Sequence, residues 1–209
     1  MTLKSPARSP FLGGMSAASQ SLGTAGSSSP EPAVSVAAPP HPREADRLAA
    51  LYDLDILDTA ADRRFDRLTA LAADVLEVPI ALISLVDANR QWFKSTCGLS
   101  LSETPREPSF CGHAILEEQL LVIEDARLDR RFAKNPFVVG APYIRFYAGV
   151  VLRSVNALPL GTLCVIDQTP RIFDRVARRR LVTLGELVEQ ELEHQHDLHA
   201  MRRRLEAAR

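Results

Sequence analysis

A thiol and an imidazole, Cys111 and His113, stand two positions apart and are the residues best suited to chemistry in this sequence. Such a pair could supply a thiolate activated by its neighbour, or two ligands for a metal ion. On a helix, side chains at i and i+2 point about 200° apart, so this pair cannot easily share one ligand. The remaining histidines lie far away along the chain: His41, His194, His196 and His199. We therefore expect no metal site and favour a buried cysteine beside a hydrogen-bonded structural histidine.

Three further residues have side chains that suit ligand binding but also have simpler interpretations. Arg145 could offer a bidentate fork to an anion, or it could pair with an acid such as Asp125 or Glu103. Trp92 and Phe93 are neighbours on a predicted strand, so their rings should face opposite sides of the sheet. Packing in the core is the simpler interpretation for both rings.

Aromatic residues gather around segments that should border loops, which is where pockets over a sheet tend to form. We predict a cavity beneath the loops 97–110 and 134–143. Nothing in the sequence identifies a cofactor or the ligand itself. The candidate ligand-binding residues are Trp92, Phe110, Cys111, His113, Phe132, Arg145 and Tyr147.

Hydrophobic periodicity divides the chain into helices and strands from residue 43 onward. Thr59 and Asp62 have the spacing of a capping box and predict a helix start, after a first helix over 44–57. The nearly continuous apolar run 80–86 predicts a buried central strand. Further strands are expected at 90–96, 120–123, 145–152 and 160–166, short helices at 111–117 and 129–133, and a long helix from 174 onward. This order predicts an α+β fold: a central antiparallel sheet of five to six strands, with helices on one face and loops and short helices covering the other.

Composition divides the chain into three parts. Residues 1–42 are rich in Ser, Ala and Pro and are expected to be a disordered tail, because they contain too few large apolar groups to offset the entropy of ordering. Residues 43–173 are expected to form the folded domain. Residues 174–209 are expected to form an amphipathic helix suited to dimerisation or signalling.

Charge and cysteine content exclude several classes of partner. The formal net charge of the 209 residues is −1, which gives no strong field to attract nucleic acid or an anionic membrane. The arginine triplets at 178–180 and 202–204 are separated by glutamates, which is typical of a solvated helix face. No apolar run approaches the ~18 residues that a membrane helix needs. Three widely spaced cysteines indicate a reduced, cytoplasmic setting.

Four blocks of the sequence together resemble the bacterial GAF domain, a module that senses small molecules. They are RQWFKS at 90–95, SFCGHAI at 109–115, IRFYAG at 144–149 and LGTLCVID at 160–167. The resemblance spans roughly 43–190 and implies a GAF/PAS-like sheet with a ligand cavity between the sheet and its covering loops. Family members of this type usually continue into a histidine kinase or a diguanylate cyclase. Because neither region is recognisable in this sequence, the chain looks like a stand-alone domain. A histidine kinase or a diguanylate cyclase is then an expected partner.

The resemblance leaves three functions open. The leading one is a cytoplasmic sensory or regulatory domain that binds a small molecule or partner and signals through a helical homodimer. Free methionine-R-sulfoxide reductases are GAF-like enzymes whose motif is similar to the residues around Cys111, but they need a further cysteine where 136–147 has none. On this ground we expect no enzyme. The third is a dimerisation module without a ligand, in which the cavity is filled.

The expected homodimer uses the helix 44–57 and the helix 174–205. An isolated projecting helix is marginal in water, so a partner helix is a natural cover for an apolar stripe. The stripe assigned to this contact is Leu184, Val188, Leu192 and Leu198. The alternative is that the helix folds back and covers the sheet of a monomer.

Overall fold

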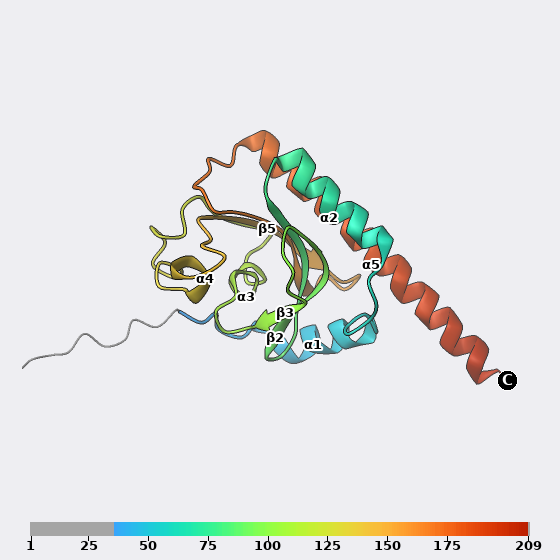
Figure 1. Ribbon diagram of the computed structural model, residues 1–209. Helices are drawn as coiled ribbons and strands as arrows, with labels where there is room; N and C mark the ends of the chain where they lie inside the picture. The colour runs from blue at the N-terminus through green and yellow to red at the C-terminus, as the bar shows by residue number, and fades with distance from the viewer. Residues whose placement is uncertain (1–35, 209) are drawn as a thin grey trace, which may run out of the picture. The chain divides into compact units, whose positions relative to one another are not determined.

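The computed structural model describes residues 36–208 of the chain (Figure 1). The tail predicted over 1–42 therefore lies outside the described residues, except for 36–42. In that short segment the backbone carbonyl of Val36 lies 2.9 Å from Nε2 of His113. The segment thus contacts the folded domain ahead of the first helix.

A six-stranded antiparallel sheet forms the centre of the domain, as predicted, in an α+β fold with strand order β3-β2-β1-β6-β5-β4. The two middle strands, β1 and β6, are buried along their whole length, which explains their continuous apolar runs. The short strand β3 falls in a polar segment that was expected to be a loop. The strands are β1 Ile80–Val86, β2 Arg90–Cys97, β3 Glu103–Pro105, β4 Leu120–Ile123, β5 Phe146–Arg153 and β6 Pro159–Asp167.

Helices cover the sheet unequally. Figure 1 shows α2 and α5 running alongside each other over one face, with α3 and α4 on the other side of the sheet. The prediction of a short helix at 129–133 is wrong, because that stretch forms turns. The helix α4 follows it and is capped by the side chain of Asn135. The helices are α1 Glu44–Asp53, α2 Arg63–Leu76, α3 Phe110–Ala114, α4 Pro136–Val139 and α5 Arg175–Ala207.

The start of α2 differs from the predicted capping box. The carboxylate of Asp62 accepts a hydrogen bond from the backbone N–H of Arg64, so Asp62 is the N-cap residue. The Thr59 hydroxyl instead donates to the carbonyl of Ile56, 2.6 Å away. Thr59 therefore belongs to the preceding turn and not to the helix start.

The helix α5 has two halves with different surroundings. Its first half packs against α2 and β5, where Gly185 allows close approach: a Cβ atom there would lie 2.6 Å from Cγ1 of Val150. Three residues assigned above to a dimer contact, Leu184, Val188 and Leu192, are buried in this core. That assignment is wrong for these three, because the sheet of the same chain already covers them.

The second half of α5 runs beyond the sheet and is largely exposed (Figure 1). Its apolar residues Leu198, Met201 and Leu205 are 36%, 63% and 69% exposed. Among residues 36–208, no helix combines the length and the apolar character that crossing a bilayer requires.

Candidate functional site

A small cavity lies on the α3 face of the sheet, beneath the loops 97–110 and 134–143. Its volume is about 40 Å³. Its walls are mostly apolar, and its few polar groups include the thiol of Cys111 and the amide of Gln91. The lining residues from the sheet and α3 are Ile80, Leu82, Gln91, Phe93, Thr104, Phe110, Cys111, Tyr147 and Ile166; those from the covering loops and α4 are Leu99, Leu101, Ser109, Phe137, Pro142 and Ile144.

Gln91 presents an unpaired acceptor in this wall. Its Nε2 donates to Oγ1 of Thr104 at 2.7 Å, but Oε1 has no hydrogen-bond partner within residues 36–208. Only 7% of the Gln91 side chain and backbone is exposed. A buried acceptor without a donor is costly, so this oxygen would favour a ligand that brings an N–H or O–H group.

The predicted aromatic residues form a stack at the cavity wall. The ring of Phe110 stacks on Tyr147 at 5.1 Å between centroids and on Phe132 at 4.1 Å. Phe110 and Tyr147 reach the cavity surface, whereas Phe132 lies behind Phe110 and does not. The stack holds α3 against β5.

His113 lies behind the same stack and has a structural role. Its ring packs edge-on against Phe132 at 4.9 Å between centroids. Burial lowers the pKa of His113, which favours the neutral imidazole with Nε2–H donating to the carbonyl of Val36. In the part of the chain that the structure describes, no group of three His, Cys, Asp or Glu residues could hold a metal ion.

Arg145 and Trp92 lie away from the cavity. The Arg145 guanidinium binds the Asp125 carboxylate through two hydrogen bonds of 2.8 and 2.6 Å, and this pairing lowers the pKa of Asp125. Trp92 packs in the core on the α2 face, and its neighbour Phe93 lines the cavity in its place. Successive residues of a strand face opposite sides, and the sequence does not say which of these two rings faces the ligand.

A cluster of thiols and hydroxyls lies where α3 meets the sheet. Sγ of Cys111 lies 3.9 Å from Sγ of Cys164, which comes from the central strand β6. The Tyr147 hydroxyl donates to Sγ of Cys111 at 3.5 Å. Gly149 makes this reach possible, because a Cβ atom there would overlap the Tyr147 hydroxyl. A second thiol was sought in the sequence over 136–147, which contains none; the structure instead places Cys164, 53 positions away in sequence, beside Cys111.

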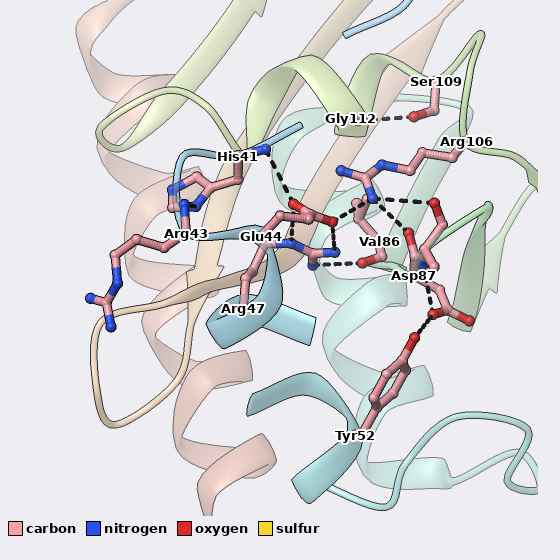
Figure 2. Close-up of polar contacts among 11 residues, drawn as sticks. His41, Arg43, Glu44, Arg47, Tyr52, Val86, Asp87, Arg106, Ser109 and Gly112 are labelled. Atoms are coloured by element: carbon pink, nitrogen blue, oxygen red, sulfur yellow. Dashed lines mark hydrogen bonds and ion pairs between the residues drawn. The ribbon is translucent and has the colours of Figure 1, made fainter. Parts of the chain in front are cut away.

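An ion-pair network fixes the loop that leads into α3 (Figure 2). The Arg47 guanidinium is fully buried and donates to Glu44 at 3.0 and 2.8 Å and to the carbonyl of Val86 at 2.6 Å. Arg106 donates to the same Glu44 carboxylate at 2.6 Å and to the carbonyl of Asp87 at 3.1 Å. Burial alone would raise the pKa of Glu44, but the hydrogen bonds from the two arginines lower it to about 2. The network joins α1, the β1–β2 turn and the loop before Ser109.

A larger hollow of about 440 Å³ lies between α1, α5 and the β5–β6 hairpin. It is lined by charged side chains that include Asp53, Arg153, Glu189 and Glu193. Ligand sites are usually lined mainly by apolar side chains, with few polar groups. The smaller cavity on the α3 face fits that description better, and we treat it as the candidate site.

Comparison with known proteins identifies the family. The GAF domain model matches residues 60–192, so the chain belongs to the GAF domain family. A cyclic di-GMP phosphodiesterase of Pseudomonas aeruginosa is 47% identical over 137 residues, which are 65% of this chain and 23% of that protein. The chain thus spans about a quarter of the length of this relative.

Solved structures with a similar fold share little sequence with the chain. The GAF domain of an Acinetobacter phosphoenolpyruvate-protein phosphotransferase has a TM-score of 0.54 at 20% identity and covers 74% of this chain and 98% of its own. The free methionine-R-sulfoxide reductase of Neisseria meningitidis, solved with its substrate, has a TM-score of 0.52 at 18% identity, covering 72% and 92%. At these identities the similarity concerns the fold alone.

The expectation that the chain is no enzyme is corrected by the sequence comparison. The relative that is 47% identical to this chain is named a phosphodiesterase, which is an enzyme. That expectation rested on the cysteine missing from 136–147, which bears only on the thiol-dependent reduction of free methionine-R-sulfoxide. Hydrolysis of a phosphodiester needs no thiol, so the cysteine count had no bearing on it.

Proposed function

We propose that this chain is a cytoplasmic sensory and regulatory GAF domain that acts in the turnover of cyclic di-GMP. In this account a small molecule in the α3-face cavity controls the protein, and α5 carries the response within a homodimer. The proposal rests on the position of β5, which lies between the cavity and α5. Tyr147 of this strand lines the cavity on one face, while Val150 contacts Gly185 of α5 on the other.

The identity of 47% to a cyclic di-GMP phosphodiesterase supports the choice of cyclic di-GMP turnover. Two sequences this similar over 137 residues are expected to share a fold and a related role. In this proposal the domain regulates the rate at which cyclic di-GMP is consumed, and a separate protein region acts on the nucleotide.

The size of the cavity restricts its ligand. Drug-sized ligands occupy about 300–1,000 Å³, whereas this cavity holds about 40 Å³. A larger ligand therefore requires movement of α4 and of the loop around Leu99 and Leu101, which form the cover. The same small volume favours the second candidate function, a GAF dimerisation module that binds no ligand.

The exposed second half of α5 supports the dimer. Leu198, Met201 and Leu205 are spaced by three and four residues, which is the spacing of a heptad seam. All three are exposed in the chain by itself. Parallel pairing of α5 from two copies would cover this seam and join the two sheets through a continuous helix.

Cellular cyclic di-GMP tests the proposal. The whole chain is produced in a Pseudomonas aeruginosa host, and cyclic di-GMP is quantified by mass spectrometry. We expect the level to differ from that of cells with an empty vector, and the difference to vanish for L198D/M201D. Val176→Asp, which changes another exposed apolar residue of α5, is the matched control and should act like the native chain. Equal levels in native-chain and empty-vector cells would refute the assignment to cyclic di-GMP turnover.

A further inference from the structure

The two buried thiols of Cys111 and Cys164 are close enough to react with each other. Their sulfurs lie 3.9 Å apart, and a disulfide needs about 2.05 Å, so a small displacement of the short helix α3 would join them. Cys111 lines the cavity, whereas Cys164 does not. A molecule in the cavity therefore meets Cys111 first, with Cys164 behind it.

The groups around the pair favour a reactive thiol at Cys111. Hydrogen bonding from Cys164 first, and also from the hydroxyl of Tyr147, lowers the pKa of Cys111 against the effect of burial. The same contact, together with burial, raises the pKa of Cys164, which stays a protonated donor. A thiolate is the nucleophilic form of cysteine, so the environment selects Cys111 for attack.

Two buried hydroxyls complete the cluster. Oγ of Ser84 and Oγ1 of Thr162 have no hydrogen-bond partner among residues 36–208, although both side chains are fully buried. These residues lie opposite each other on the central strands β1 and β6. Unpaired buried hydroxyls are costly, and here they could donate to an oxygen atom that arrives at the Cys111 sulfur.

The cavity volume identifies the size of the reactant. One water needs about 10–15 Å³ of such volume, so about 40 Å³ holds a molecule of two or three heavy atoms. Hydrogen peroxide has two. Methionine sulfoxide and bulky organic hydroperoxides are too large for the cavity as it stands.

We propose that Cys111 and Cys164 form a dithiol site that is oxidised by hydrogen peroxide entering the α3-face cavity. The Cys111 thiolate attacks one peroxide oxygen; an S–O bond forms, the O–O bond breaks, and the departing hydroxide takes up the proton lost by Cys111 and leaves as water. Sγ of Cys164 then attacks Sγ of Cys111; an S–S bond forms, the S–O bond breaks, and hydroxide leaves with the Cys164 proton as a second water. Both sulfurs are oxidised and the peroxide is reduced, so two thiols and one peroxide give one disulfide and two waters.

Disulfide formation would connect α3 covalently to the central strand. The linkage would draw Cys111 toward β6 and disturb the Phe110–Tyr147 stack at the cavity wall. Reduction by a dithiol would reverse it. This inference stands apart from the proposed role in cyclic di-GMP turnover, because it concerns only the chemistry of the two thiols.

Peptide mapping of the full chain tests the proposal directly. The reduced protein is treated with hydrogen peroxide, quenched, alkylated under denaturing conditions and digested, and the cysteine states are read by mass spectrometry. We expect a Cys111–Cys164 cross-linked peptide that forms at least about tenfold faster than oxidation of Cys97, the half-buried cysteine that serves as an internal control. Oxidation of Cys97 at the same rate or faster, or linkage of Cys111 to any other thiol, would overturn the proposal.

Variants and a bulky oxidant test the order of steps. In Cys164→Ala, Cys111 should stop at the sulfenic acid and be trapped by dimedone, whereas in Cys111→Ala Cys164 should stay reduced. Cys97→Ala should behave like the native chain. The bulky oxidant is tert-butyl hydroperoxide, and the preference is the rate of Cys111 oxidation by hydrogen peroxide divided by the rate with this oxidant. We expect this preference to be at least about tenfold larger in the folded chain than in the urea-unfolded chain. An equal preference in the two states would refute the role of the cavity, and dimedone labelling of Cys164 in Cys111→Ala would refute the order of attack.

Discussion

Gly185 of α5 lies directly against Val150 of β5, so close that a Cβ atom on the glycine would stand 2.6 Å from a methyl carbon of the valine. The absence of a side chain at Gly185 lets the helix pack closely on the sheet at this point. Because β5 also carries Tyr147 at the cavity wall, the contact connects the candidate ligand site with the helix proposed to carry the response.

Gly185→Ala tests how tightly α5 is seated. Overpacking a well-filled core costs about 1–3 kcal/mol, and we expect a loss in the free energy of unfolding within that range. Combining it with Val150→Ala should recover part of the loss, because the smaller side chain makes room for the new methyl group. Urea denaturation of the two single variants and the double variant measures the coupling. Strictly additive losses would show that the two residues do not press on each other.

Gly149→Ala tests the reach of Tyr147 to Cys111. The added methyl group would overlap the Tyr147 hydroxyl and force the ring away from the thiol. We expect a loss of about 1–3 kcal/mol in the free energy of unfolding. Tyr147→Phe is the matched control: it keeps the stacked ring and removes a single hydrogen bond, so it should cost about 1 kcal/mol. A larger loss in Tyr147→Phe than in Gly149→Ala would contradict this account.

Acid titration tests the Glu44 network. The pKa of Glu44 falls from an ordinary value of 4.5 to about 2 in the folded chain. Because the folded-state pKa is depressed, the stabilisation is fully present above pH 4.5 and is lost as the pH falls from 4.5 to about 2. We expect the loss to amount to about 1–2 kcal/mol, after allowance for screening by solvent.

The measurement compares unfolding free energies of the native chain and Glu44→Gln across this pH range. The variant should be less stable at neutral pH, and its difference from the native chain should shrink as the pH falls. Glu107→Gln, which changes an exposed carboxylate in the neighbouring loop, should follow the native profile. A difference between the native chain and Glu44→Gln that stays constant down to pH 2 would argue against the network.

The fold was largely predictable because it depends on local patterns. The continuous apolar run of β1 and the heptad-like spacing in α5 are properties of neighbouring residues, and the elements formed where these patterns indicated. The face that each element buries was harder to predict. Leu184, Val188 and Leu192 suited a dimer seam equally well in sequence, and only the position of the sheet assigns them to the core of the domain.

The candidate site was predicted in part, for a similar reason. Phe110, Cys111 and Tyr147 were chosen near loop borders and line the cavity. Trp92 was predicted to bind the ligand, but its neighbour Phe93 lines the cavity. Alternation along a strand shows that the two rings face opposite sides of the sheet, but not which of them faces the cavity. Cys164 was missed as a partner of Cys111, since the two come together only through the packing of α3 on β6.

Sedimentation equilibrium of the whole protein at tens of micromolar shows whether α5 joins two copies of the chain. We predict a mass of twice the 23.0 kDa of one chain, falling to 23.0 kDa in L198D/M201D but not in the control Val176→Asp. Circular dichroism of each variant verifies that the fold is retained. A native chain that sediments at 23.0 kDa under these conditions would contradict the helical dimer and the route of signalling built on it.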